Sequence, residues 1–113
     1  MERRYRLSRS RDFDAVYRHG RSTSTRYLTL HAFPREEPEG PSRLGLAIPK
    51  SVGNAVTRNR LRRQLREVWT MKERPGGLDC VLSARPGLAE ATEAQGISWL
   101  SDRVDEVLGK AGV

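Results

Sequence analysis

Cysteine is almost absent from this 113-residue sequence, and long apolar segments are missing altogether. Cys80 is the single cysteine, so the chain can form neither a disulfide framework nor a cysteine cluster for a metal ion. No apolar run approaches the roughly 20 residues that a membrane-spanning helix needs. The basic N-terminus is not followed by an apolar region, so it does not resemble a secretory signal. A reducing, cytoplasmic setting is therefore expected.

Side chains suited to catalysis are equally scarce. The only histidines are His19 and His31, and the sequence contains no HExxH, CxxC or phosphate-loop pattern. Asp12 and Asp14 lie two residues apart on a predicted helix, so their carboxylates diverge instead of pairing. Cys80 lies within an apolar segment and is typical of a core residue. We therefore expect no protein catalytic residue and no metal site.

Basic side chains, by contrast, are abundant and unevenly placed. The chain carries 21 Lys and Arg against 14 Asp and Glu, which gives a net charge of +7. Residues 1–75 hold 18 basic and 8 acidic side chains, whereas residues 76–113 hold 3 and 6. Such a charge favours a polyanionic partner through long-range attraction and counterion release. Charge alone does not choose between RNA, DNA and an anionic membrane surface, but the partner should meet the first two thirds of the chain.

One stretch, residues 53–69, combines positive charge with an apolar stripe. Its apolar residues follow the i, i+4, i+7, i+8 spacing of one helix face: Leu61, Leu65, Val68 and Trp69. Five arginines share the same predicted helix: Arg58, Arg60, Arg62, Arg63 and Arg66. Only one acid, Glu67, lies among them, although like charges four residues apart repel each other. A solvated helix normally mixes its charges, so the pattern indicates a polyanion that relieves this repulsion, and we expect a nucleic-acid surface.

The first half of the chain predicts a helix followed by two or three strands, with residues 21–26 as either a loop or a short edge strand. The helix runs from Ser10, a candidate N-cap, to about Arg18. Residues 27–33 and 43–48 alternate apolar and polar side chains, as half-buried strands do. The acidic, proline-rich loop of residues 34–42 would join these strands as a hairpin and lie away from a nucleic acid.

The second half predicts the basic helix, one more strand and a final helix. Asn54 or Ser51 is the candidate cap of the basic helix. Residues 78–84 form a strand, residues 86–96 a linker that can include a helical turn, and an amphipathic scaffold helix begins at Ile97. The strand–helix–strand unit is long enough for its two strands to be parallel, with a right-handed crossover by default. The whole chain would form a single α+β domain.

Aromatic side chains on the first helix and on the first predicted strand have two interpretations. Phe13, Val16 and Tyr17 share one helix face, and Val16 is assigned to the core. For the two rings, burial and stacking on unpaired bases both stay open. His31 lies on the polar side of its strand, where contact with a ligand and simple exposure are equally compatible with the pattern.

Residues 44–67 closely resemble the signature of the bacterial ribonuclease P protein component. The centre of this signature is the triplet Arg58-Asn59-Arg60. Residues 7–20 and 78–85 are similar to the N-terminal helix and the last strand of the same family. The resemblance implies an α+β sandwich around a small four-stranded sheet, with a left-handed βαβ crossover in place of the default.

The resemblance also implies a function. The family's protein joins a catalytic RNA in a ribonucleoprotein endoribonuclease that removes the 5′ leader from precursor tRNA, with Mg²⁺ held mainly by the RNA subunit and the substrate. Carried over by position, the RNA-binding residues are Arg58, Asn59, Arg60, Arg62, Arg63, Arg66 and Lys50. The implied leader-binding cleft is lined by Phe13, Tyr17, Arg26, His31 and Arg85. Neither a membrane nor a small-molecule substrate belongs to this function.

Two positions depart from the family pattern. Ser51 stands where many members carry a second basic residue, and His31 stands where many carry an aromatic residue. Two other functions stay open: a protein that binds another RNA, such as a ribosomal protein without a nuclease role, and a DNA-binding protein whose exposed helix reaches base edges.

Overall fold

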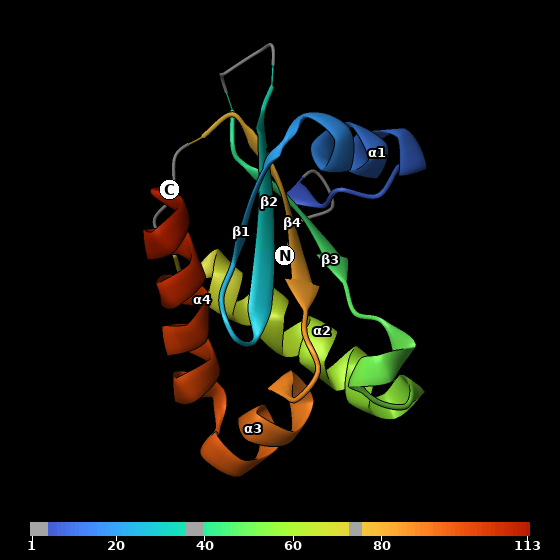
Figure 1. The fold of residues 1–113 in the computed structure, drawn as a ribbon, viewed down its shortest axis with the longest axis vertical. Helices are drawn as coiled ribbons and strands as arrows, with labels where there is room; N and C mark the ends of the chain where they lie inside the picture. The colour runs from blue at the N-terminus through green and yellow to red at the C-terminus, as the bar shows by residue number, and fades with distance from the viewer. Residues whose placement is uncertain (1–4, 36–39, 73–75) are drawn as a thin grey trace.

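A mixed four-stranded sheet with helices on both faces forms the frame of the molecule (Figure 1). The structure is a computed structural model that describes residues 5–35, 40–72 and 76–113. In chain order its elements are α1 (Ser10–His19), β1 (Arg21–Ser24), β2 (Leu28–Pro34), β3 (Arg43–Ala47), the 3-10 helix η2 (Lys50–Val52), α2 (Ala55–Thr70), β4 (Leu78–Ala84), α3 (Leu88–Gln95) and α4 (Ile97–Ala111). The predicted α+β class is confirmed.

The strand β4 lies at the centre of the sheet, whose order is β1-β2-β4-β3. It pairs antiparallel with β2 and parallel with β3, and β1 pairs antiparallel with the outer edge of β2. The predicted hairpin between β2 and β3 is therefore wrong. The physical reason is that β4 buries consecutive residues on both faces, from Asp79 to Leu82, and such a strand is best covered at the centre of a sheet. Residues 36–39, which hold all three acids of the predicted loop, lie outside the described residues.

The crossover from β3 through α2 to β4 is left-handed. In Figure 1 both strands point downward, β4 lies to the left of β3, and α2 passes behind the sheet. A right-handed connection would place α2 on the front face, where α1 packs. The default expectation is therefore wrong, and the handedness that the family resemblance implies is confirmed.

The main core lies behind the sheet, between β2, β3, β4 and the helices α2, α3 and α4. Leu28 and Leu30 of β2 face it together with Leu82 of β4, and all three are fully buried. The stripe predicted on α2 is buried as well, and it ends with the fully buried Trp69. Each fully buried leucine stabilises the fold by about 1.5–3 kcal/mol relative to exposure. This burial fixes which side of α2 faces outward.

A second, smaller core lies in front of the sheet. Val16 of α1 packs there with Leu7 and Val81, and Phe13 and Phe33 lie against them. The segment before α1 runs beside β3, since the Leu7 amide donates a hydrogen bond of 2.8 Å to the Leu44 carbonyl. In Figure 1, α1 covers only the upper part of the front face, so the lower part has no helix over it.

The ends of two helices test the predicted caps. The Asn54 side chain accepts a hydrogen bond of 2.9 Å from the Thr57 amide and caps α2, as predicted. Ser10 is not a cap, because it already lies within α1. Arg9 occupies that position, and its backbone carbonyl accepts from the Asp12 amide over 3.0 Å.

The predicted linker of residues 86–96 instead contains the helix α3. Its Leu88, Ala89 and Thr92 are buried, so this short helix closes the lower end of the main core. Glycines with positive φ angles flank it, Gly87 at 95° and Gly96 at 90°. The sequence pattern missed it because a two-turn helix shows too few periods of its apolar face.

Candidate nucleic-acid interface

The outer surface of α2 presents arginines that have no acidic partners among the described residues. Its inner stripe of Leu61, Leu65, Val68 and Trp69 is at most 4% exposed. The arginines lie around the rest of the helix. Arg58, Arg62 and Arg66 are half-buried, whereas Arg60 and Arg63 are exposed. Within the described part of the chain, none of the five forms an ion pair with a carboxylate. The predicted helix thus carries a positive charge that the fold itself leaves uncompensated.

Asn59 has a defined role on this surface. Arg62 Nη1 donates a hydrogen bond of 2.7 Å to Asn59 Oδ1, one helical turn away. This bond restrains the Arg62 guanidinium and uses only one of its nitrogens, so other N–H groups can still donate to an acceptor such as a phosphate. The carboxamide therefore orients a neighbouring arginine, a role that composition gives no hint of.

The arginines at the far end of α2 meet the N-terminal segment around a cavity. This cavity has a volume of about 540 Å³ and is lined by Arg6, Arg63, Arg66, Glu67, Thr70 and Met71. Burial lowers the pKa of Arg66, and the positive charges of Arg6 and Arg62 lower it further. The guanidinium groups gathered here repel one another, and an anion between them would relieve that repulsion.

The front of the sheet forms a separate surface, facing away from α2. There the ring of Tyr17 in α1 stands edge-on to the ring of His31 in β2, with centroids 4.9 Å apart and planes 82° apart. Tyr17 is 45% exposed, whereas His31 is half-buried. Burial lowers the pKa of His31, so the neutral imidazole is favoured. The structure brings these two predicted residues together.

Phe13, a third predicted cleft residue, has a packing role. Its ring lies directly over Gly45 of β3, so closely that a Cβ at Gly45 would come within 2.5 Å of Phe13 Cζ. The ring also packs on the small front core and lies 6.5 Å from the Tyr17 ring. Phe13 therefore supports Tyr17 from beneath and is less available for stacking.

A charged network ties α1 to the sheet beside these rings. Arg43 of β3 binds Asp79 of β4 through two hydrogen bonds, of 2.8 Å from Nε and 2.6 Å from Nη2. The same guanidinium lies 3.7 Å from the carboxylate of Asp12 in α1. The side-chain hydrogen bond with Asp79 raises the pKa of Arg43. The network sets where α1, and with it Tyr17, sits against β2.

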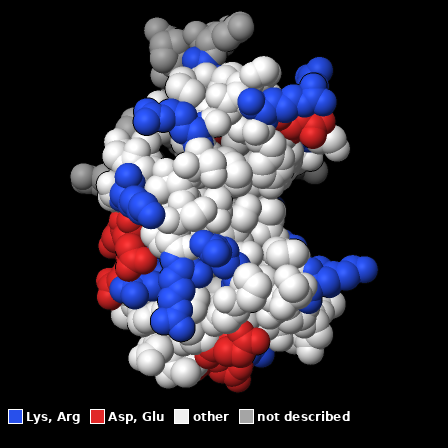
Figure 2. All heavy atoms as spheres, in the orientation of Figure 1, with Lys and Arg blue, Asp and Glu red and all other residues white. Residues whose placement is uncertain are grey.

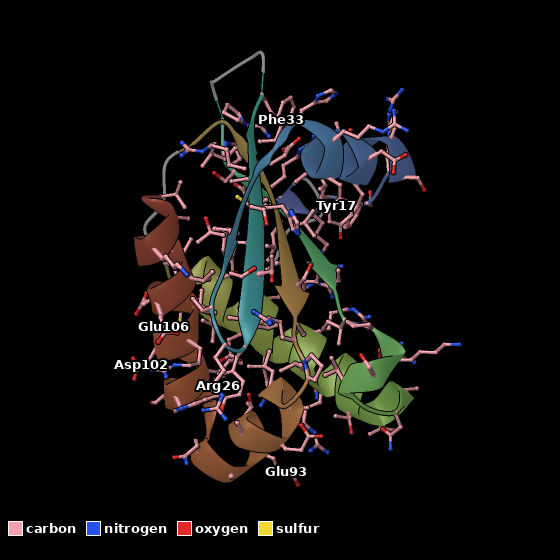
Figure 3. All side chains as sticks on the ribbon, in the orientation of Figure 1. Tyr17, Arg26, Phe33, Glu93, Asp102 and Glu106 are labelled. Atoms are coloured by element: carbon pink, nitrogen blue, oxygen red, sulfur yellow. The ribbon has the colours of Figure 1, made fainter. Side chains whose placement is uncertain are left out.

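Arg26 and Arg85 lie apart from the ring pair. Arg26 is in the turn between β1 and β2, and Figure 3 places it at the lower end of β2, well below Tyr17. Arg85 follows β4 and joins Arg26 there, because its Nη1 donates a hydrogen bond of 2.6 Å to the Thr25 carbonyl. Lys50 is exposed in η2, beyond the end of β3. The predicted cleft residues therefore fall into two groups on one face.

A row of hydroxyl groups connects the two groups, and sequence reasoning missed it. Ser24 and Thr29 share a hydrogen bond of 3.0 Å between β1 and β2, and Thr29 stands opposite Ser83 of β4. Figure 2 shows this face, where Lys and Arg side chains surround a largely uncharged middle. The polar side of the β2 alternation was the available signal for Thr29, but the neighbouring strands were needed to extend it.

The described residues contain no obvious metal site. No three His, Cys, Asp or Glu side chains among them converge so that they could hold an ion. In the same ranges, no helix combines the length and the apolar character needed to span a membrane.

Comparisons with known proteins agree on one family. Residues 1–111 match the family model described as ribonuclease P. The chain is 37% identical over 94 residues to the ribonuclease P protein component of Brevibacillus brevis, an alignment that covers 81% of this chain and 74% of the relative. The same component of Bacillus cereus is 35% identical over 94 residues, with 81% of each chain covered.

Two solved structures share the fold over most of the chain. A Staphylococcus aureus RNase P protein mutant with defective mRNA degradation activity gives a TM-score of 0.85 at 29% identity, covering 100% of this chain and 92% of that one. The RNase P protein from Thermotoga maritima gives a TM-score of 0.81 at 28% identity, covering 91% and 94%.

Proposed function

Because this chain belongs to the ribonuclease P protein family, we propose that it is the protein subunit of a ribonucleoprotein endoribonuclease that removes the 5′ leader from precursor tRNA. The observation that carries this proposal is the uncompensated charge of α2, whose five arginines have no described acidic partner. A protein with this function works in the cytoplasm, where precursor tRNA is processed.

The outer surface of α2 is the proposed docking site for the catalytic RNA. Arginine binds phosphate through two parallel N–H groups, and every contact of this kind releases counterions from the RNA. Arg60 and Arg63 are exposed enough to reach a backbone, while Asn59 holds Arg62 beside them. The opposite side of the helix is locked into the core, so the charged surface is presented rigidly.

The front of the sheet is the proposed site for the single-stranded leader. Tyr17 offers an exposed ring on which an unpaired base can stack. The hydroxyl groups of Ser24 and Thr29 can bond to phosphate or to ribose hydroxyl groups along the strand. Since α2 and the front face lie on opposite sides of the sheet, the protein can hold the catalytic RNA and the leader at once.

The proposed chemistry places Mg²⁺ with the RNA subunit and the substrate. The described residues offer no cluster that would hold the ion, and no step of the reaction is assigned to a side chain of this protein. The contribution of the protein is then to bind and orient the two RNAs, which lowers the entropic cost of the reaction.

Reconstitution tests the proposal directly. The catalytic RNA of a related ribonuclease P is assayed for cleavage of precursor tRNA across a Mg²⁺ titration, with and without the protein. We expect the protein to lower the Mg²⁺ concentration required for half-maximal cleavage, and the double variant Arg60→Ala/Arg63→Ala to lower it less. An unchanged Mg²⁺ requirement would remove the proposed function and favour a protein that binds another RNA. Tighter binding of duplex DNA than of leader RNA at equal salt would favour a DNA-binding protein.

A further inference from the structure

We propose that a second contact for single-stranded RNA lies at the lower end of the sheet, beside the front face, where the β1–β2 turn meets α4. This inference rests on the proposed function, because it extends the leader site beyond Tyr17. The contact consists of Arg26, Tyr27, Trp99 and Arg103, which we call the ring–arginine ladder. The family resemblance assigned no role to the last three of these residues.

The ladder alternates guanidinium groups and rings from two distant parts of the chain. Arg26 Cζ lies 5.1 Å from the centroid of the Tyr27 ring. The Tyr27 ring meets the Trp99 ring of α4 edge-on, with centroids 5.0 Å apart and planes 77° apart. Arg103, one turn along α4, places its Cζ 5.2 Å from the centroid of Trp99. Both rings are half-buried and pack against the main core, so each keeps part of its surface open to solvent.

The charge of this surface is only partly compensated by the described residues. Arg26 is exposed and forms no ion pair with a described carboxylate, and the same holds for Arg85 beside it. Arg103 lies 3.6 Å from Glu106, but its Nε is buried without a hydrogen-bond partner among the described residues. An acceptor brought by a ligand could use the groups that the fold leaves unsatisfied.

Acidic side chains border the ladder on its outer sides. Figure 3 shows Asp102 and Glu106 on the outer side of α4 and Glu93 at the lower end on α3, with Arg26 on the sheet side of them. In Figure 2 the basic patch in the lower part of the molecule is bounded by acidic patches at its left and below. A polyanion would be repelled at these borders and directed over the sheet.

The path over the sheet leads to the ring pair. Four residues of extended chain separate His31 from Tyr27, roughly 13 Å at the rise of a strand. The hydroxyl groups of Ser24 and Thr29 lie between these positions, and Thr29 shares the front face with His31. One flexible strand of RNA could therefore stack on Tyr17 at one end and reach the ladder at the other.

The chemistry of the ladder fits unpaired bases. Every base has a face that stacks on an aromatic ring or a guanidinium plane, so such contacts tolerate any sequence. Neighbouring arginines bind the phosphates of the same strand. An acidic peptide would use the arginines but would gain little from Tyr27 and Trp99. The ladder is therefore assigned to the single strand, with a longer leader binding more tightly than a short one.

Tryptophan fluorescence provides the first test. The chain has two tryptophans, and Trp69 is fully buried, so Trp99 is the one that a ligand can touch. A ten-nucleotide single-stranded RNA with a 3′ fluorophore is titrated into the full-length protein, and binding is followed by anisotropy. We expect the tryptophan emission to fall in step with binding, and the Trp99→Phe protein, whose fold is checked by circular dichroism, to lose this change. Emission that stays constant while the RNA binds would overturn the proposal.

Leader length provides the second test, in the holoenzyme. Binding of precursors with leaders of two and of ten nucleotides is measured for holoenzymes that contain the parent, Arg103→Ala or Arg21→Ala protein. Arg21 is the matched control, because it is exposed at the other end of β1 and alternates onto the opposite face of the sheet. We expect Arg103→Ala to weaken binding of the long-leader precursor by about fivefold or more and to leave binding of the short-leader precursor unchanged.

The outcomes separate this proposal from the proposed function. An equal loss for both precursors would make the ladder a purely structural contact and overturn the proposal. If the parent holoenzyme bound precursors with and without a leader equally well, the proposed function itself would fail. Quenching of Trp99 by RNA would in that case still support the contact. Arg103→Lys, which keeps the charge without the planar guanidinium, should recover only part of the long-leader affinity.

Discussion

The Tyr17 ring of α1 stands edge-on to the His31 ring of β2, 4.9 Å away between centroids. This pair is the point at which the front helix and the sheet meet through aromatic groups. The Tyr17 side chain is 45% exposed there, while the His31 ring is half-buried. The pair thus combines an accessible stacking surface with a rigid support.

Replacing Tyr17 by alanine should weaken binding of leader-bearing precursor tRNA by ~1–3 kcal/mol, as expected for the loss of one stacking contact. Binding constants of the holoenzyme for precursor and for mature tRNA measure the effect. Tyr17→Phe keeps the ring and should bind both as the parent does. A similar loss for mature tRNA would show that Tyr17 does not act through the leader.

Acidification should reduce stability through His31. Burial lowers its pKa in the folded protein, so the unfolded chain, with an ordinary pKa of about 6.5, takes up the proton first as pH falls. The contribution of His31 to the free energy of unfolding should therefore decrease as the pH drops through about 6.5 and below. Urea unfolding of the parent and of His31→Gln between about pH 8 and pH 5.5 measures this, since most carboxylates stay ionised in that range. Parallel pH profiles for the two proteins would contradict the prediction.

Tyr17→Ala should also move the titration of His31. Removing the phenol ring increases access of water to the imidazole, so the pKa of His31 should rise toward its ordinary value. Proton–nitrogen NMR spectra recorded across the titration give the midpoint in each protein. An unchanged midpoint would mean that groups other than Tyr17 bury the imidazole.

Gly45→Ala should destabilise the fold by ~1–3 kcal/mol, the usual cost of overpacking. The new Cβ would meet the Phe13 ring at 2.5 Å, and the backbone of Gly45 is held in place by the pairing of β3 with β4. Urea unfolding gives the free energy. Phe13→Leu places a smaller side chain opposite the new methyl group, so the double variant Gly45→Ala/Phe13→Leu should recover part of the lost stability. Strictly additive effects of the two substitutions would argue against this contact.

Arg60→Ala should weaken assembly with the catalytic RNA by ~1–2 kcal/mol and reduce the salt slope of binding by about 1. The reason is that one phosphate contact, and its share of counterion release, is removed from α2. Binding is measured at several salt concentrations, with Arg21→Ala as a control of equal charge. The prediction fails if the slope matches that of the parent.

The sequence was sufficient wherever the structural cause is local. The Asn54 cap depends on residues three positions apart, and the stripe around Leu61 and Leu65 repeats with the turn of one helix. The bounds of β4 follow from its own apolar run, and the structure has them at the predicted residues. Periodicity and short-range hydrogen bonds carry this information directly.

Contacts between distant segments could not be predicted in this way. The hairpin expected between β2 and β3 failed because their true partner, β4, comes later in the chain. The position of Phe13 over Gly45 and the separation of Arg26 from Tyr17 also depend on how the elements pack. The contact of Trp99 with Tyr27 joins two distant segments as well, so the pattern of α4 alone predicts only a scaffold helix.

The central position of β4 has a consequence for synthesis of the protein. Both of its neighbours precede it in the chain, so while β4 is still within the ribosome β2 and β3 lack the strand that joins them. The native pairs of β4 with β2 and β3 must then wait for contacts of long sequence separation, which form slowly. Until β4 has emerged, neither the arginine surface of α2 nor the front face has the central strand that supports both of them. The nascent chain should therefore become competent to join an RNA partner in one late step, after residue 84 has emerged.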